Sequence, residues 1–147
     1  MTTPPVAWQL EHAVDANASL AFVWVWRTDI TTWDDPPARF ELEGPFVIGA
    51  EGKTILPGQA PLRWALRDVR PNESFLIEMP LDQAAVLFEW RFEAIDDRRT
   101  RLTQRIGVGG ENAASYADQV RTGFGATLVD GMARLARAIE DAARSRT

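Results

Sequence analysis

Four polar side chains fall at positions where the surrounding pattern of residues is apolar. His12 and Gln104 lie on the apolar faces of two predicted strands, while Tyr116 and Arg121 lie on or beside the apolar side of a predicted C-terminal helix. Histidine exchanges a proton near neutral pH, so His12, together with Tyr116, is a candidate for acid–base chemistry. Arg121 could hold a carboxylate or phenolate of a ligand at the mouth of a cavity.

A purely structural role is the alternative for each of these four residues. His12 can be a satisfied residue of the core, and Gln104 and Tyr116 can hydrogen-bond to neighbouring backbone groups. Arg121 can bury its aliphatic stem and extend its charge into solvent. The sequence leaves these alternatives open, and no catalytic residue is assigned beyond the candidates His12 and Tyr116.

Composition excludes several common chemistries. The chain has no cysteine and one histidine, which excludes disulfides, thiolate nucleophiles and multi-histidine metal sites. Glu78 and Glu89 face away from the predicted interior, so a site built on paired carboxylates is not expected. The sequence also contains no nucleophile with an adjacent base and no glycine-rich phosphate loop. It therefore predicts no metal and no cofactor.

The charge balance disfavours a nucleic-acid partner. The 147 residues include 16 basic and 21 acidic ones, for a net charge of −5, and the basic residues are interspersed with acidic ones. Phosphate binding requires grouped Lys and Arg. The most apolar run, residues 20–26, is far shorter than the ~20 residues that span a bilayer, and the N-terminus lacks a signal-peptide pattern. We therefore expect a cytoplasmic protein without stable membrane insertion, as a monomer or a homodimer.

The beginning of the chain alternates between apolar and polar residues and then becomes helical. Residues 6–15 are predicted to form a half-buried strand, because alternate residues are apolar and share one face: Val6, Trp8, Leu10, His12 and Val14. A very apolar helix is expected over residues 18–29, with Asn17 or Asp15 as its N-cap. A second short helical or turn segment is expected around residues 31–35, before two prolines.

Further strands are predicted along the middle of the chain, separated by turn residues. Their approximate ranges are 39–43, 49–56, 62–67, 74–79, 86–93 and 102–108. Their close spacing favours antiparallel pairing, since parallel pairs need long crossovers. The remaining residues, 112–143, have the periodicity of one long amphipathic helix. Neither an internal repeat nor a linker interrupts this pattern, so we expect a single domain over residues 1–147.

These elements predict an α+β fold. A curved antiparallel sheet of about seven strands would wrap around the long C-terminal helix, with two short helices after the first strand. Gly131, on the apolar side of that helix, either allows close packing on a ring such as Trp90 or keeps space open for a ligand. The residues expected to line a cavity between sheet and helix, and to contact a ligand there, are Trp64, Phe75, Ile77, Phe88, Trp90, Phe92, Gln104, Ile106, Tyr116, Val120, Arg121, Phe124 and Leu128.

Four local motifs resemble those of one protein family. They are Val23-Trp24 followed by Thr28-Asp29 and Trp33, then Leu42-Glu43-Gly44-Pro45 followed by Gly49, then Val69 with Pro71 and Phe75, and finally Thr100-Arg101-Leu102-Thr103. Together with the order of elements, they resemble the START-like (SRPBCC) superfamily, in particular its bacterial polyketide cyclase/dehydrase-like branch. The resemblance implies a helix-grip fold over nearly the whole chain. Because that superfamily includes lipid carriers, hormone receptors, cyclases and chaperone regulators, it does not fix the function.

Three functions are compatible with the resemblance. The first is binding of a small hydrophobic or aromatic ligand, such as a lipid, a polyketide or an isoprenoid-like molecule, in the cavity. The second is a cyclase or dehydratase that acts by acid–base enolisation in the same cavity, with His12 or Tyr116 moving the proton. The third is a chaperone-activator-like interaction module, which would have a filled interior and a working outer surface.

Overall fold

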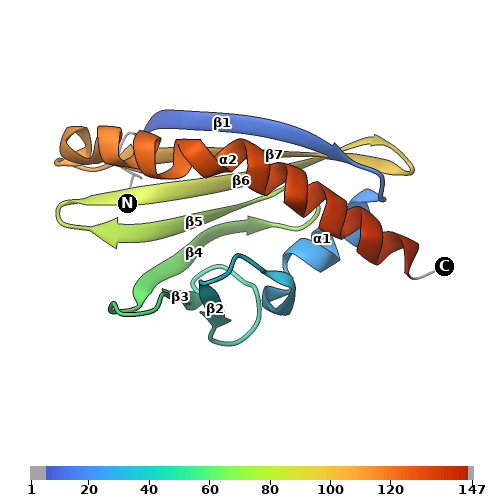
Figure 1. Cartoon of the computed structure of the whole chain (residues 1–147), viewed down its shortest axis with the longest axis horizontal. Helices are drawn as coiled ribbons and strands as arrows, with labels where there is room; N and C mark the ends of the chain where they lie inside the picture. The colour runs from blue at the N-terminus through green and yellow to red at the C-terminus, as the bar shows by residue number, and fades with distance from the viewer. Residues whose placement is uncertain (1–5, 146–147) are drawn as a thin grey trace.

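The protein, seen in a computed structural model, is described over residues 6–145. Its elements in chain order are β1 (Val6–Ala16), α1 (Leu20–Arg27), the 3-10 helix η1 (Ile30–Thr32), β2 (Arg39–Leu42), β3 (Glu51–Ile55), β4 (Leu62–Arg70), β5 (Ser74–Leu81), β6 (Ala84–Asp96), β7 (Arg99–Gly109) and α2 (Ala113–Arg144). The predicted order of strands and helices is confirmed, with bounds that shift by a few residues (Figure 1).

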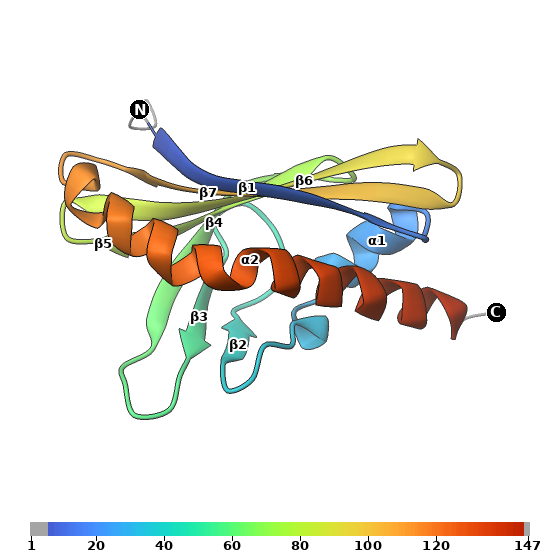
Figure 2. The same cartoon turned by 45° about the horizontal axis from the view of Figure 1, so that its top comes forward.

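All seven strands form one antiparallel sheet in the order β1-β7-β6-β5-β4-β3-β2. Successive strands from β2 to β7 are hydrogen-bonded neighbours, and β1 pairs with β7 at the far edge. The sheet bends so that β2 and β3 stand well away from the plane of β1, β7 and β6, and α2 crosses its concave side (Figure 2). This is the predicted curved sheet around a long C-terminal helix.

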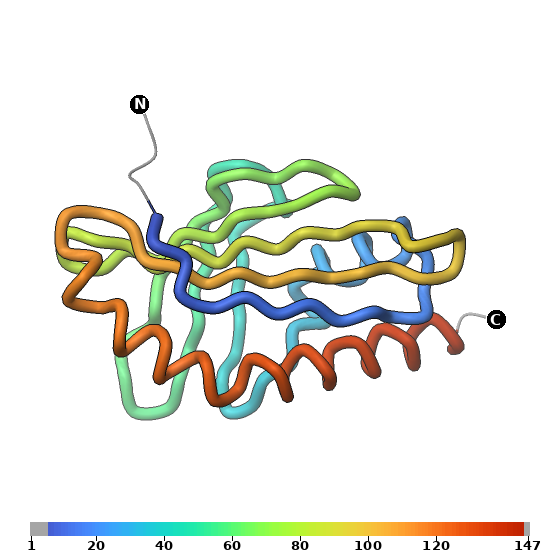
Figure 3. Tube along the Cα trace, turned by 90° about the horizontal axis from the view of Figure 1, so that it is seen from above, coloured from blue at the N-terminus to red at the C-terminus, as the bar shows by residue number. Residues whose placement is uncertain are grey.

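The long helix covers one half of the concave face. α2 packs mainly against β1 and β7, with smaller contacts to β6 and α1, and Figure 3 shows it running beside β1. A Cβ at Gly125 would lie 3.6 Å from a methyl carbon of Leu10, which is an ordinary van der Waals distance. Neither α2 nor any other helix within residues 6–145 is both long and apolar enough to cross a bilayer.

The short helices cover the other half of the concave face. Trp24 of α1 contacts Phe75 of β5 edge-on, and Trp33, directly after η1, stacks on Trp64 of β4. Phe46, in the segment between β2 and β3, also meets Phe75 edge-on at a centroid distance of 5.0 Å. The strands that α2 leaves uncovered are therefore closed by aromatic side chains from three separate segments.

The start of α1 is fixed by residues that the sequence analysis did not select. Ser19, rather than Asn17 or Asp15, is the N-cap, and its side chain accepts a hydrogen bond from the backbone N–H of Phe22 at 3.2 Å. The buried hydroxyl of Thr100 donates to the carbonyl of Ala18 at 2.8 Å, which ties the helix start to β7. The two candidates lie too early because β1 continues to Ala16.

A β-bulge in β1 reverses the predicted side-chain directions of Val6 and Trp8. Trp8 pairs with Gly107 and Leu10 pairs with Ile106, so Gln9 is the extra residue between them. From Leu10 onward the apolar residues point inward as predicted, but Trp8 points to the convex face, where the guanidinium of Arg105 lies 4.1 Å from its ring centroid. The prediction that Val6 and Trp8 share a face with Leu10 was wrong, because strict alternation assumes no inserted residue.

The convex face of the sheet carries ion pairs. Glu89 accepts a hydrogen bond from Arg105 at 3.0 Å and forms an ion pair with Arg91 at 2.8 Å. Glu78 forms an ion pair with Arg67. Both glutamates therefore face away from the interior, as the alternation predicted.

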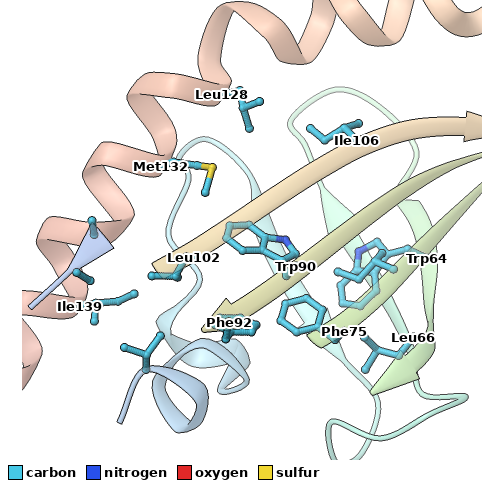
Figure 4. Close-up of a cluster of buried hydrophobic side chains, with 14 of the residues drawn as sticks. Trp64, Leu66, Phe75, Trp90, Phe92, Leu102, Ile106, Leu128, Met132 and Ile139 are labelled. Atoms are coloured by element: carbon cyan, nitrogen blue, oxygen red, sulfur yellow. The ribbon is translucent and has the colours of Figure 1, made fainter. Parts of the chain in front are cut away.

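The core lies between the concave face, α1 and α2 (Figure 4). At the α1 end, aromatic rings pack in a continuous cluster in which Phe75 stacks on Trp90 and lies 5.8 Å from Phe92. On the α2 side, Met132 and Leu128 point toward the sheet, near Leu102 and Ile106 respectively. The aromatic part of the interior is thus filled, and any open space must lie on the α2 side of it.

Candidate functional site

A row of side chains crosses the concave face at the middle of the sheet. The register pairs His12 of β1 with Gln104 of β7, and it pairs Gln104 with Trp90 of β6. Cross-strand partners point to the same face, and Trp90 lies in the core, so His12 and Gln104 point inward as predicted. Both are only partly buried, and neither side chain has a hydrogen-bond partner within residues 6–145. Their polar atoms are available to a molecule in the interior.

Arg27, at the end of α1, lies between two indole rings. Its guanidinium carbon is 4.3 Å from the ring centroid of Trp90 and 4.5 Å from that of Trp33. The Trp33 ring is itself held by a hydrogen bond from its Nε1 to the carbonyl of Arg27 at 2.8 Å and by stacking on Trp64. The cation is therefore positioned by packing against aromatic faces rather than by an acidic partner.

The electrostatic environment of Arg27 is unusual. Its Nε is fully buried and makes no hydrogen bond, and within residues 6–145 no carboxylate forms an ion pair with it. Burial lowers the pKa of Arg27 from its ordinary value to about 9, because the charged form loses its hydration. With a pKa of about 9 the guanidinium still carries its charge at neutral pH. The interior thus holds a cation without a protein counter-ion.

A second feature of the interior is the incomplete burial of Phe88. Its neighbours on the inner face of β6, Val86 and Trp90, are 2% and 4% exposed, whereas Phe88 is only partly buried although β6 is the third strand from the edge. It meets Phe124 of α2 edge-on at 5.3 Å, and Phe124 is also partly buried. Because the two rings contact each other, the area that each leaves exposed lies beside the pair, between sheet and helix.

The residues predicted to line the cavity divide into three groups by burial. Eight are fully buried in the core, namely Trp64, Phe75, Ile77, Trp90, Phe92, Ile106, Val120 and Leu128. Four are partly buried, namely Phe88, Gln104, Tyr116 and Phe124. The last residue, Arg121, is exposed and forms an ion pair with Asp118 on the same helix. Its charge therefore extends into solvent, as in the structural role considered for it from the sequence.

Two hollows of the molecular surface lie away from this space. One of about 680 Å³ is lined by Asn17 and residues 96–99 at the β6–β7 hairpin, and one of about 450 Å³ lies along the outer side of α2, from Thr127 to Arg137. Neither is lined by a residue predicted to contact a ligand. A Cβ at Gly131 would meet only the side chain of Arg134, at 3.9 Å, so this glycine is not required for close packing on Trp90.

Arg27 is the residue that the sequence analysis missed. It lies one helical turn after Val23, which is completely buried, so the two share a face of α1. That spacing was the available signal. A basic residue in the last turn of a helix is ordinarily explained by the helix dipole, and the sequence does not show that Trp33 and Trp90 enclose it.

The same fold occurs in solved structures of other proteins. Norcoclaurine synthase from Thalictrum flavum, in complex with dopamine and hydroxybenzaldehyde, is similar over 98% of this chain and 90% of that chain, with a TM-score of 0.69 and 12% identity. The Zhui aromatase/cyclase from Streptomyces sp. R1128 is similar over 97% and 96%, with a TM-score of 0.66 and 18% identity. Ara h 8.0201 is similar over 96% and 99%, with a TM-score of 0.66 and 16% identity.

These likenesses define the class of the fold. The chain has the helix-grip fold that these solved structures share, and the predicted fold is thereby confirmed. No model of a protein family matches the sequence, and no curated protein matches it. At these identities the likeness concerns the fold, and the function has to be argued from the interior itself.

Proposed function

We propose that the protein binds a small apolar or aromatic molecule between the sheet and α2. The ligand would lie against Phe88 and Phe124, with His12 and Gln104 offering polar contacts at one side. An apolar wall with a few polar groups is the usual composition of a small-molecule site. The solved structures of the same fold include one that holds two small aromatic molecules.

The observation that carries this proposal is the partial exposure of inward-facing residues. Phe88, Phe124, His12 and Gln104 all point into the space between sheet and helix and are all incompletely buried. In a closed core such residues would pack against one another. Polar side chains without partners in a filled core would also cost about 1–3 kcal/mol each. A bound molecule would supply both the missing packing and the missing hydrogen bonds.

The expected affinity is modest. Burying about 400 Å² of apolar surface contributes about 10 kcal/mol. Association costs at least about 4 kcal/mol in lost freedom. The net of about 6 kcal/mol corresponds to a dissociation constant of tens of micromolar. Titrations should therefore extend to high micromolar ligand.

The direct test is titration with N-phenyl-1-naphthylamine, a neutral apolar fluorophore, while tryptophan quenching is followed. We expect saturable binding that weakens about tenfold or more in Phe88→Ala, because the variant removes part of the apolar wall. Leu76→Ala is the matched control, since Leu76 pairs with Glu89 and lies on the convex face of the neighbouring strand. Absence of binding by the wild-type protein, or equal losses in both variants, would contradict the proposal.

A second candidate function is acid–base catalysis on a bound β-ketone, and the inward position of His12 beside Gln104 favours it. His12 would take a proton from the carbon between two carbonyls, the resulting enolate carbon would attack a further carbonyl, and the new alkoxide would take up a proton. Loss of water would then complete a cyclisation. Turnover that survives both His12→Ala and Tyr116→Phe would exclude this version.

A further inference from the structure

We propose that Arg27 binds the acidic group of the ligand, so that the preferred ligand is an apolar or aromatic monocarboxylate. This inference rests on the proposed function, because it assigns a chemical class to the molecule bound between sheet and α2. Its basis is the position of a single unpaired cation beside the row formed by Trp90, Gln104 and His12.

Arg27 differs from the other arginines without an ion-pair partner. Within residues 6–145 those others are exposed, so water stabilises their charge; they are Arg39, Arg63, Arg98 and Arg137. Arg27 is only partly accessible and its Nε is shielded completely. A buried cation is tolerated when it is paired or hydrogen-bonded. The two indoles compensate it in part, and a carboxylate would complete the compensation.

Because Nε of Arg27 is buried, a carboxylate would bind through the terminal Nη1 and Nη2 groups. Trp33 and Trp90 contact the cation through their rings, whereas the N–H groups of a guanidinium point outward in its own plane. A carboxylate accepts two parallel N–H bonds in that plane. The rings also fix the cation before binding, so less conformational freedom is lost when the anion binds.

The neighbouring residues match a single negative charge attached to an apolar body. Trp90 beneath Arg27 pairs with Gln104 in the register, so an amide lies beside the site as a further donor. Within residues 6–145 no second cation stacks on Trp33 or Trp90, and a phosphate with two charges would require more than one. Phe88, on the same inner face of β6, begins the apolar surface for the rest of the molecule.

The experiment compares 2-naphthoic acid with its neutral analogue 2-naphthamide at neutral pH, by calorimetry and tryptophan quenching. In the wild-type protein we expect the acid to bind at least about tenfold more tightly than the amide. Arg27→Met and Arg27→Gln should remove that preference and leave the affinity for 2-naphthamide within about twofold. Arg63→Met is the matched control, since Arg63 is exposed and has no ion-pair partner within residues 6–145, and it should change neither affinity.

The outcomes separate this inference from the proposed function. Equal affinities for acid and amide in the wild-type protein would overturn the role of Arg27 while leaving apolar binding intact, and this measurement needs no variant to fold. An unchanged preference for the acid in a folded Arg27→Met or Arg27→Gln protein would overturn it as well. If neither naphthyl compound nor N-phenyl-1-naphthylamine binds the wild-type protein, the proposed function itself is wrong.

Discussion

The indole of Trp64 lies directly across Gly52, its cross-strand partner on β3. A Cβ at Gly52 would come within 2.4 Å of Cη2 of that indole, and the ring nitrogen donates to the hydroxyl of Thr54 at 3.1 Å. Only a glycine lets the ring reach that hydroxyl. Trp64 in turn stacks on Trp33, which contacts Arg27, so this glycine supports one wall of the candidate site.

Gly52→Ala should therefore destabilise the protein, because the new methyl group forces the Trp64 ring to move. We expect a loss of about 2 kcal/mol in the free energy of unfolding, measured by urea denaturation followed by tryptophan fluorescence. Gly123→Ala is the matched control. A Cβ there meets nothing within 4 Å on α2, so that variant should gain about 0.5–1 kcal/mol from helix propensity. Equal effects of the two substitutions would contradict the packing of Trp64 described here.

Thr100→Val should be destabilising although it preserves the shape of the side chain. The hydroxyl of Thr100 is completely buried and donates to the carbonyl of Ala18, so its removal leaves a buried acceptor unsatisfied, at about 1–3 kcal/mol. Thr103→Val, on the convex side of the same strand, lacks such a partner within residues 6–145 and should be nearly neutral. Thermal unfolding of both variants tests this. A neutral Thr100→Val would show that α1 does not depend on this bond.

Arg27→Met should change the pH dependence of stability in a defined direction. Burial lowers the pKa of Arg27 to about 9 in the folded protein, below its pKa in the unfolded chain, so between these two pKa values the unfolded chain binds a proton that the folded chain lacks. Wild-type stability relative to the variant therefore rises with pH in that window. At neutral pH the variant should be at least as stable, since it removes a buried, unpaired charge.

The measurement is the difference in unfolding free energy between wild type and Arg27→Met at about pH 7 and about pH 10.5. Over this range we expect the wild type to gain about 1–2 kcal/mol of unfolding free energy relative to the variant. Arg121→Met, in which an exposed arginine is removed, should show no such change. A pH-independent difference for Arg27→Met would mean that the guanidinium is well hydrated in the folded protein.

Glu89→Gln should lower the free energy of unfolding by more than the removal of an average surface charge does. Glu89 binds both Arg105 and Arg91, and its side chain is 19% exposed, so the variant weakens two contacts of a partly desolvated carboxylate; we expect a loss of about 1–2 kcal/mol. Glu41→Gln removes the exposed pair with Lys53 at 3.5 Å and should cost less than about 0.5 kcal/mol. Urea denaturation at low and high salt would measure both variants. Similar losses of unfolding free energy would contradict the expectation that Glu89 contributes more than Glu41.

Local patterns were sufficient for the fold and insufficient for the site. Alternation correctly placed Leu10, Gln104 and Phe88 on the inner face, because successive side chains of a strand point to opposite faces of the sheet. The same rule failed for Trp8, since the inserted Gln9 has no signature in composition. Arg27 was missed for a different reason. Its setting is created by Trp33 and Trp90, which belong to other segments, and no local pattern shows which segments meet.

The inserted residue in β1 also has a practical consequence. Downstream of Gln9, pairing of Leu10 through Ala16 with β7 is continuous, whereas upstream of it Trp8 belongs to the convex side with Arg105. A probe or tether introduced at Val6, which pairs with Gly109 and shares the convex side with Trp8, would thus report on the outer surface while the inward residues kept their register. The first residues of β1 therefore offer an attachment point for labelling on the side of the sheet opposite to the proposed ligand site.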